Sequence, residues 1–364
     1  MPRVGHLVGR GLSDITGEPA DCGMLGYGKS TQRTKGLHLR LRSRAFVFAD
    51  AEDPTNRVLL VVNDLPLILE GITQAVLREL RLRHGDAYRE HNVMITATHT
   101  HSGPGGYGHH LLYNLTTNGF HPRTFDAIVD GMLEAIERAH ADVAPAELSL
   151  AHGELHDAST NRSPTSFARN PLPDKDFFPN AIDPQTTLLR IDRGGRTVGA
   201  VNWFATHGTS MSNHNCLISG DNKGYAGYHW ERVAKGISYP ERTSEDFVGA
   251  FAQTNAGDMS PNLSKGGRPG AAHAPGSGPT EDEFENTRII GMRQYEAAAA
   301  LAGESGTALG DGVEVRFAYL DLGGTIVRPE FTGDGREHRT SPAQTAAAAL
   351  AGTDEGKGFP GFRQ

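Results

Sequence analysis

The chain has 364 residues, of which 37 % are hydrophobic, and this is enough to bury the core of one large domain or two smaller ones. Its 43 acidic residues outnumber 35 basic ones, giving a formal charge of -8 without a dense Lys/Arg run, which argues against nucleic acid as a partner. Its two cysteines, Cys22 and Cys216, are too few for a disulfide scaffold.

Strand-like and helix-like segments alternate along the chain. Runs of branched or aromatic residues predict the strands, and apolar residues at helical spacing predict the helices. In chain order the predicted elements are a hairpin of strands 44–49 and 57–62, a helix 67–82, a strand 92–98, a helix 125–136, strands 146–150, 187–191 and 198–204, a helix 225–234 and a strand 247–253. This order predicts an α/β fold with a mixed sheet flanked by helices, in a single large domain with an incomplete C-terminal part.

The C-terminal third begins with a segment that disfavours regular structure. Residues 263–279 are dense in Gly, Pro, Ala and Ser and predict an exposed loop or a hinge. Thr280 and Glu283 have the spacing of a capping box, so an amphipathic helix is expected from this point to about residue 300. The last residues, 353–364, are Gly-rich and polar, which predicts that the chain stops within a loop.

The strongest local signal is the run Thr-His-Thr-His-Ser-Gly-Pro-Gly-Gly at 98–106, directly after a predicted buried strand. Active sites favour such strand ends. In extended geometry His99 and His101 point to the same side, which suits metal binding, and the glycines allow close approach of a substrate. The alternative is that both histidines are hydrogen-bonded loop residues.

A third histidine, His207, also follows a predicted apolar strand and precedes a glycine. Catalytic zinc usually takes three or more protein ligands plus water, so His99 and His207 alone leave its coordination incomplete. Asp64, which follows the strand 57–62, either fixes the tautomer of a ligating histidine or caps a turn.

Two common hydrolase patterns are absent. Ser260 lies in the run Asn-Ala-Gly-Asp-Met-Ser-Pro-Asn at 255–262, and Pro261 and Asn262 break the nucleophile-elbow pattern G-x-S-x-G, which disfavours a serine hydrolase. Gly103 and Pro104 stand where the metallo-β-lactamase-like pattern HxHxDH has Asp and His, which disfavours that fold as well.

The sequence resembles the neutral/alkaline, non-lysosomal ceramidase family along essentially its whole length. The resemblance is specific because many long motifs occur in the same order. They are the runs at 11–17 (GLSDITG), 24–27 (MLGY), 39–46 (LRLRSRAF), 98–106 (THTHSGPGG), 161–164 (NRSP), 219–225 (SGDNKGY), 255–262 (NAGDMSPN) and 282–285 (DEFE).

The resemblance implies hydrolysis of the amide bond of ceramide (N-acylsphingosine) to sphingosine and a fatty acid at a single Zn²⁺. His99 and His207 match the family's zinc-binding histidines, His101 and Arg162 match residues around the reacting amide, and Ser260 matches a serine required for activity. The family's other zinc ligands, a glutamate and a tyrosine, are expected beyond residue 364. Residues 1–364 are therefore expected to form the N-terminal catalytic domain, without the family's C-terminal immunoglobulin-like domain.

In the implied mechanism, zinc polarises the amide carbonyl and lowers the pKa of bound water towards ~7. His101 relays a proton to the leaving amine, and Arg162 or the Ser260 hydroxyl stabilises the oxyanion. Two alternatives remain open: a metal-dependent amidase that acts on another N-acyl lipid, and an inactive lipid-binding fragment that lacks the downstream ligands.

The expected partner is ceramide or a related N-acyl lipid, with a possible peripheral membrane contact. The N-terminus has no visible secretory signal, and the longest apolar runs are shorter than the ~20 residues that span a bilayer. Because family members commonly act outside the cell or at its surface, the expected localisation is extracellular or cell-surface, with a cytoplasmic protein as the alternative.

Overall fold

The computed structural model describes residues 5–241, 243, 246–263, 277–310, 312–342, 351–356, 358 and 361. Its strands are β1 (His6–Asp14), β2 (Ala20–Leu25), β3 (Arg33–Lys35), β4 (Arg42–Asp50), β5 (Arg57–Asn63), β6 (Val93–Ala97), β7 (Gly103–Pro104), β8 (Ala144–Glu154), β9 (Thr160–Asn161), β10 (Gln185–Arg193), β11 (Arg196–Phe204), β12 (Val248–Gln253), β13 (Met259–Ser260), β14 (Thr307–Ala308), β15 (Ile326–Val327) and β16 (His338–Arg339). Its helices are α1 (Glu70–His84), η1 (Glu90–Asn92), α2 (Leu111–Asn114), α3 (Pro122–Ala141), α4 (Pro164–Phe167), α5 (Leu172–Phe177), α6 (Asp221–Tyr228), the π-helical η2 (His229–Ala234), α7 (Glu283–Gly303) and η4 (Pro329–Phe331).

The main sheet is mixed, as predicted. Its strand order is β12-β11-β10-β8-β1-β4-β5-β6, and β14 pairs with β8. β5 and β6 are parallel, as are β11 and β12, whereas the other pairs along this path are antiparallel. The predicted hairpin is confirmed, because β4 and β5 pair antiparallel across the turn between them.

The sheet folds back on itself at β8. Its first residues, Ala144 to Ala146, pair with β1, and its residues from Glu147 onward pair with β10. We call β1, β4, β5 and β6 the N-terminal half-sheet and β8, β10, β11 and β12 the C-terminal half-sheet. Apolar side chains of both half-sheets form one core between them, and β12 contacts β4, β5 and β6 across it. Burial of this shared face holds the two half-sheets together.

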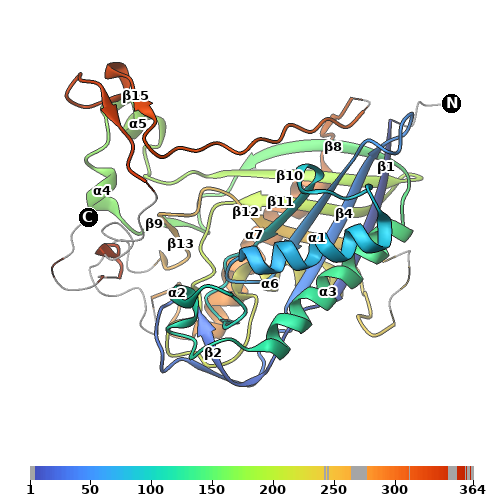
Figure 1. Ribbon diagram of the computed structural model, residues 1–364, viewed down its shortest axis with the longest axis horizontal. Coiled ribbons are helices and arrows are strands. Elements are labelled where there is room, and N and C mark those ends of the chain that lie inside the picture. Colours follow the sequence, from blue (N-terminus) through green and yellow to red (C-terminus); the bar gives the residue numbers. More distant parts are fainter. Residues whose placement is uncertain are drawn as a thin grey trace.

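Helices cover the outer face of each half-sheet, which makes four layers (Figure 1). α1 and α3 lie against the N-terminal half-sheet, where Ala45, Val47 and Leu59 meet the apolar faces of both helices. α6 and α7 cover the C-terminal half-sheet through a second cluster that includes Trp230 and Phe251. Among the described residues, no helix is both long and apolar enough to cross a bilayer.

The predicted helix start at Thr280 is two residues too early. α7 begins after Asp282, whose carboxylate accepts hydrogen bonds from the backbone N–H groups of Phe284 and Glu285. Glu283 accepts instead from the backbone N–H of Ser212, so it fixes a loop and does not complete a capping box. Most of the predicted loop 263–279 and half of the segment 353–364 lie outside the described residues.

The central strand β1 is absent from the predicted elements, which begin only after the Gly-rich opening of the chain. Gly9 and Gly11 face α3, and a Cβ at either position would lie 1.9 Å from the carbonyl oxygen of Ala139 or Ala135. These glycines therefore permit close approach of α3 to the sheet.

We expect the substitution Gly11→Ala to lower the free energy of unfolding by about 3 kcal/mol or more, because a methyl group must displace helix backbone and not a flexible side chain. The matched control is Gly303→Ala at the end of α7, where nothing lies within 4 Å of the added Cβ. That variant should change stability by less than about 1 kcal/mol. Urea-induced unfolding followed by circular dichroism measures both, and equal midpoints for the two variants would contradict the close approach.

Candidate metal centre

Three histidines from two distant segments converge at one end of the sheet. His99 and His101 follow β6, and His207 follows β11. Each offers one ring nitrogen, and these nitrogens all lie within 4.8 Å of one another. The predicted meeting of His99 and His207 is thus present in the structure, with ring centroids 4.8 Å apart.

The two loops that carry these histidines are bonded to each other and to neighbouring strands. Thr100 and Gly208 form a parallel bridge, in which the backbone N–H of His101 donates to the carbonyl oxygen of Gly208 at 2.8 Å. The backbone N–H of His99 donates to the carbonyl oxygen of Leu65 at 3.0 Å. The backbone around the cluster is therefore fixed from both half-sheets.

The sequence predicted that an extended backbone would bring His99 and His101 to the same side. This prediction is wrong, because the backbone at His99 is not extended. β6 ends at Ala97, and His99 has a φ of +66°, in the left-handed region. A residue other than glycine adopts this conformation only when its surroundings impose it, and such residues cluster at functional sites. The turn at His99 brings its ring to 4.7 Å, centroid to centroid, from the ring of His101.

The hydrogen bonds of His99 and His207 use Nδ1 and leave Nε2 of each ring available for a metal. His99 Nδ1 lies 2.7 Å from the carbonyl oxygen of Pro66, and His207 Nδ1 lies 3.0 Å from that of Met259. A carbonyl only accepts, so Nδ1 carries the proton in both rings and Nε2 keeps its lone pair. The Nδ1–carbonyl bond is a usual outer partner of metal-binding histidines.

Electrostatics favour the same neutral form. Burial lowers the pKa of His99 and, further, that of His207, and the nearby Arg162 guanidinium adds to both shifts. Neutral imidazole is the form that binds a metal. The donor set, its tautomers and its protonation state therefore fit a metal ion.

Asp64 does not orient either histidine, although that was one of its two predicted roles. Its carboxylate accepts hydrogen bonds from the Arg44 side chain and from the backbone N–H of Arg42. The carbonyl oxygens of Pro66 and Met259 take the tautomer-fixing place instead. Sequence could not reveal this, because backbone carbonyls have no residue signature.

His101 belongs to the same cluster. Its Nε2 lies 3.2 Å from Nε2 of His99, and its ring packs edge-on against Tyr27 with centroids 4.7 Å apart. This position is compatible with a third metal ligand and with a group that transfers a proton beside the metal. The predicted role of His101 in proton relay stays a prediction.

β9 and β13 form a two-stranded ribbon (Figure 1), in which Ser260 pairs with Thr160, and Arg162 directly follows β9. The Arg162 Nε donates to the carbonyl oxygen of Gly257 at 2.9 Å, and burial lowers the pKa of this arginine. Ser260 is fully buried and directly follows Met259, whose carbonyl oxygen binds His207. The structure thus brings both predicted catalytic residues to the cluster, while their roles stay predictions.

Glu355 is a site residue that sequence reasoning missed. Its Oε1 accepts hydrogen bonds from Ser260 Oγ at 2.8 Å and from Asn262 Nδ2 at 2.7 Å, and burial raises the pKa of its carboxyl. Its backbone N–H donates to the carbonyl oxygen of Arg162 at 3.1 Å. The segment that carries it is Gly-rich and polar and was interpreted as a loop end, so no local pattern marked this carboxylate.

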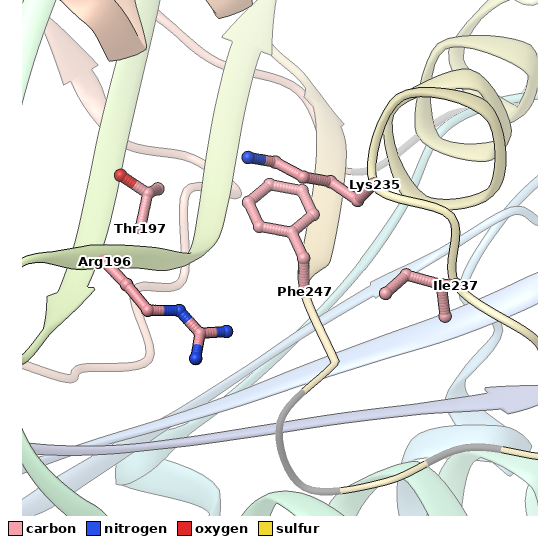
Figure 2. A pocket seen from close by; sticks show the side chains of 5 residues that line it. All are labelled: Arg196, Thr197, Lys235, Ile237 and Phe247. Atoms are coloured by element: carbon pink, nitrogen blue, oxygen red, sulfur yellow. The ribbon is translucent and has the colours of Figure 1, made fainter.

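A cavity of about 280 Å³ lies away from the histidines, at the opposite ends of β11 and β12 (Figure 2). It is lined by Arg196, Thr197, Lys235, Ile237 and Phe247, and the Lys235 ammonium lies 5.3 Å from the centre of the Phe247 ring. This lining contains no histidine, cysteine or carboxylate, so it offers no metal site.

The fold and the cluster define the class of protein: an α/β protein with a candidate histidine metal centre at the strand ends of a folded sheet. A comparison with family models then identifies the family. The model described as neutral/alkaline non-lysosomal ceramidase, N-terminal, matches residues 6–364, and the chain belongs to this family. The resemblance predicted from the motifs is confirmed.

Individual relatives agree with this assignment. The chain is 59 % identical over 359 residues to a neutral ceramidase of Mycobacterium tuberculosis, covering 98 % of this chain and 55 % of that protein. It is 43 % identical over 361 residues to a neutral ceramidase of Pseudomonas aeruginosa, covering 99 % and 51 %. The chain thus spans about half the length of these curated relatives.

Solved structures share the fold. A crystal structure of neutral ceramidase from Pseudomonas aeruginosa matches with a TM-score of 0.82 at 43 % identity, over 93 % of this chain and 51 % of that one. A structure described as ceramidase complexed with C2 matches with a TM-score of 0.85, over 100 % of this chain and 54 % of that one.

Proposed function

We propose that this chain is the metal-binding N-terminal part of a zinc-dependent enzyme that hydrolyses the amide bond of ceramide to sphingosine and a fatty acid. One observation carries the proposal: His99 and His207, from the two half-sheets, present the unprotonated Nε2 of neutral rings to a common point. Family membership supplies the substrate class, because the relatives are named neutral ceramidases.

Zinc is the proposed metal because the cluster offers imidazole nitrogen, whereas Mg²⁺ and Ca²⁺ prefer oxygen ligands. When bound, zinc supplies a Lewis acid and activates water for attack on an amide. His99 and His207 are the two ligands proposed from this chain. The remaining ligands are proposed to be the glutamate and tyrosine that the family resemblance implies beyond residue 364.

The contacts of Ser260, Arg162 and His101 suggest a different role for each residue around the amide. The Ser260 hydroxyl donates its single proton to Glu355, so it has none left for an oxyanion. Arg162 keeps its positive charge beside His99 and His207, and we propose it as the donor that stabilises negative charge on the amide oxygen. His101, beside His99, is proposed to pass a proton to the leaving amine.

The test uses the purified 364-residue chain, first stripped of metal and then titrated with zinc. Zinc binding near one ion per chain is expected, and N-acylsphingosine and a panel of other N-acyl lipids and small amides are then assayed for release of the amine. Zinc-dependent hydrolysis that favours N-acylsphingosine supports the proposal, and preference for another amide points to a different amidase. A chain that binds the lipid without hydrolysing it, even when loaded with zinc, would favour the lipid-binding alternative. Failure to bind zinc would contradict the metal centre itself.

A further inference from the structure

The side chain of Gln253 lies between the two loops that carry the histidines. Gln253 is the last residue of β12, and its Nε2 donates to two carbonyl oxygens, that of Thr98 at 3.1 Å and that of Thr206 at 2.6 Å. Its Oε1 accepts the backbone N–H of Thr206 at 3.2 Å. The amide orientation is fixed by these partners, because the reverse orientation would place its oxygen against two carbonyls.

The positions of these bonds relate directly to the metal centre. Thr98 immediately precedes His99, and Thr206 immediately precedes His207. One amide group therefore holds the residue before each of the two proposed ligands, although the ligands come from different half-sheets.

The residues that follow the two histidines are also joined to each other. Thr100, after His99, is bridged to Gly208, after His207. Each histidine thus lies in the middle of a three-residue stretch whose two ends are joined to the corresponding ends of the other stretch. The bridge is made by backbone alone, whereas the link before the histidines depends on one side chain, that of Gln253.

We propose that Gln253 is a positioning residue that sets the separation and orientation of His99 and His207 and thereby the zinc affinity of the site. This inference rests on the proposed zinc function for its consequence, but the positioning itself is a property of the metal-free chain. The left-handed φ of His99 adds to the argument, because such a backbone persists only where surrounding contacts impose it. The bond from Gln253 to Thr98, the residue before His99, is one of these contacts.

The test compares Gln253→Met with a matched control, Asn92→Leu. Methionine has the length of glutamine but cannot form the three hydrogen bonds. Asn92 makes the same kind of bonds at the other end of β6: its Nδ2 donates to the carbonyl oxygens of Arg57 and Ala87, and its Oδ1 accepts the N–H of Arg89. Each variant loses two donated hydrogen bonds and one accepted hydrogen bond, so a general loss of stability should affect both.

The first readout is NMR of the metal-free chain, which reports the tautomers of His99 and His207 and the through-space contact between their rings. We expect Gln253→Met to weaken the ring contact and mix the tautomers, whereas Asn92→Leu leaves both as in the parent. The second readout is zinc titration at a temperature where all three proteins are folded. Zinc affinity should fall by about 10- to 100-fold in Gln253→Met, the range for loss of an outer partner of a ligand, and stay at the parent value in Asn92→Leu.

The outcomes separate the two proposals. Unchanged rings and unchanged zinc affinity in Gln253→Met would overturn the positioning role, as would equal disturbance of the rings by Asn92→Leu. Disturbed rings in Gln253→Met together with a parent that binds no zinc would uphold the positioning role and reject the zinc function.

Discussion

Replacement of His99 or His207 by alanine is expected to lower the zinc affinity of this chain more than any other single substitution. Each variant removes one of the two ligands proposed from the three histidines that converge there. The loss should therefore exceed the roughly 10- to 100-fold effect of removing only an outer partner. Isothermal titration of the metal-free variants with zinc measures it.

The matched control is His140→Ala. His140 is also a partly buried histidine with a lowered pKa, and its Nδ1 lies 2.8 Å from the hydroxyl of Tyr88, but it belongs to α3 and lies outside the cluster. This variant should bind zinc as the parent does. Retention of parental zinc affinity in both His99→Ala and His207→Ala would show that these residues do not share an ion.

The second large effect, on stability, is expected from substitution of Arg44, whose guanidinium joins the N-terminal half-sheet to η2, the helix that contacts β12 of the C-terminal half-sheet. Arg44 lies on β4, and its side chain donates two hydrogen bonds to Glu231 of η2, at 2.9 and 3.1 Å, and one to Asp64 at 3.0 Å. All three side chains are 2 % exposed or less. Gly220 and Gly224, near the start of α6, pack directly against Asp64.

We expect Arg44→Met to lower the free energy of unfolding by about 3–5 kcal/mol, because it leaves two buried carboxylates without a counter-charge. Burial already raises the pKa of Asp64, and loss of the arginine should raise it further. The folded variant then binds more protons than the unfolded chain, so its stability deficit should shrink as the pH falls below neutral. Urea-induced unfolding at several pH values tests both the size and the direction.

Arg83→Met is the control for loss of an arginine at the surface. Arg83 pairs with Glu79 at 3.7 Å, and its side chain is 43 % exposed. Such a pair contributes about 0–1 kcal/mol. If Arg44→Met were no more destabilising than Arg83→Met, the buried ion pairs would not hold the half-sheets together.

The hydrophobic pattern predicted most of the sheet but not its curvature. Short runs of branched or aromatic residues marked β4, β5 and β11, because burial of a strand leaves a local signature in residue type. β1 was missed since its glycines serve contact with α3, which is a long-range requirement. The fold of the sheet at β8 arises from pairing with two different partners, and no local pattern shows such a change.

The sequence predicted the proposed metal ligands but not the residues that hold them in position. His99 and His207 were marked by their residue type and their place after strands. Gln253 and Glu355 act through partners that lie far away in sequence, and a single glutamine or glutamate carries no motif. The backbone carbonyls that fix the tautomers could not be predicted either, because every residue has one.

The folding of the sheet has a consequence for how ligand binding and folding are coupled. Each half-sheet contributes one of the two proposed ligands, so a chain segment that ends before β11 has no pair of histidines from both sides. An ion that recognises only the joined arrangement adds RT ln(1 + [L]/Kd) to the free energy that keeps the halves docked. The free energy that keeps the two half-sheets docked would then increase with zinc concentration.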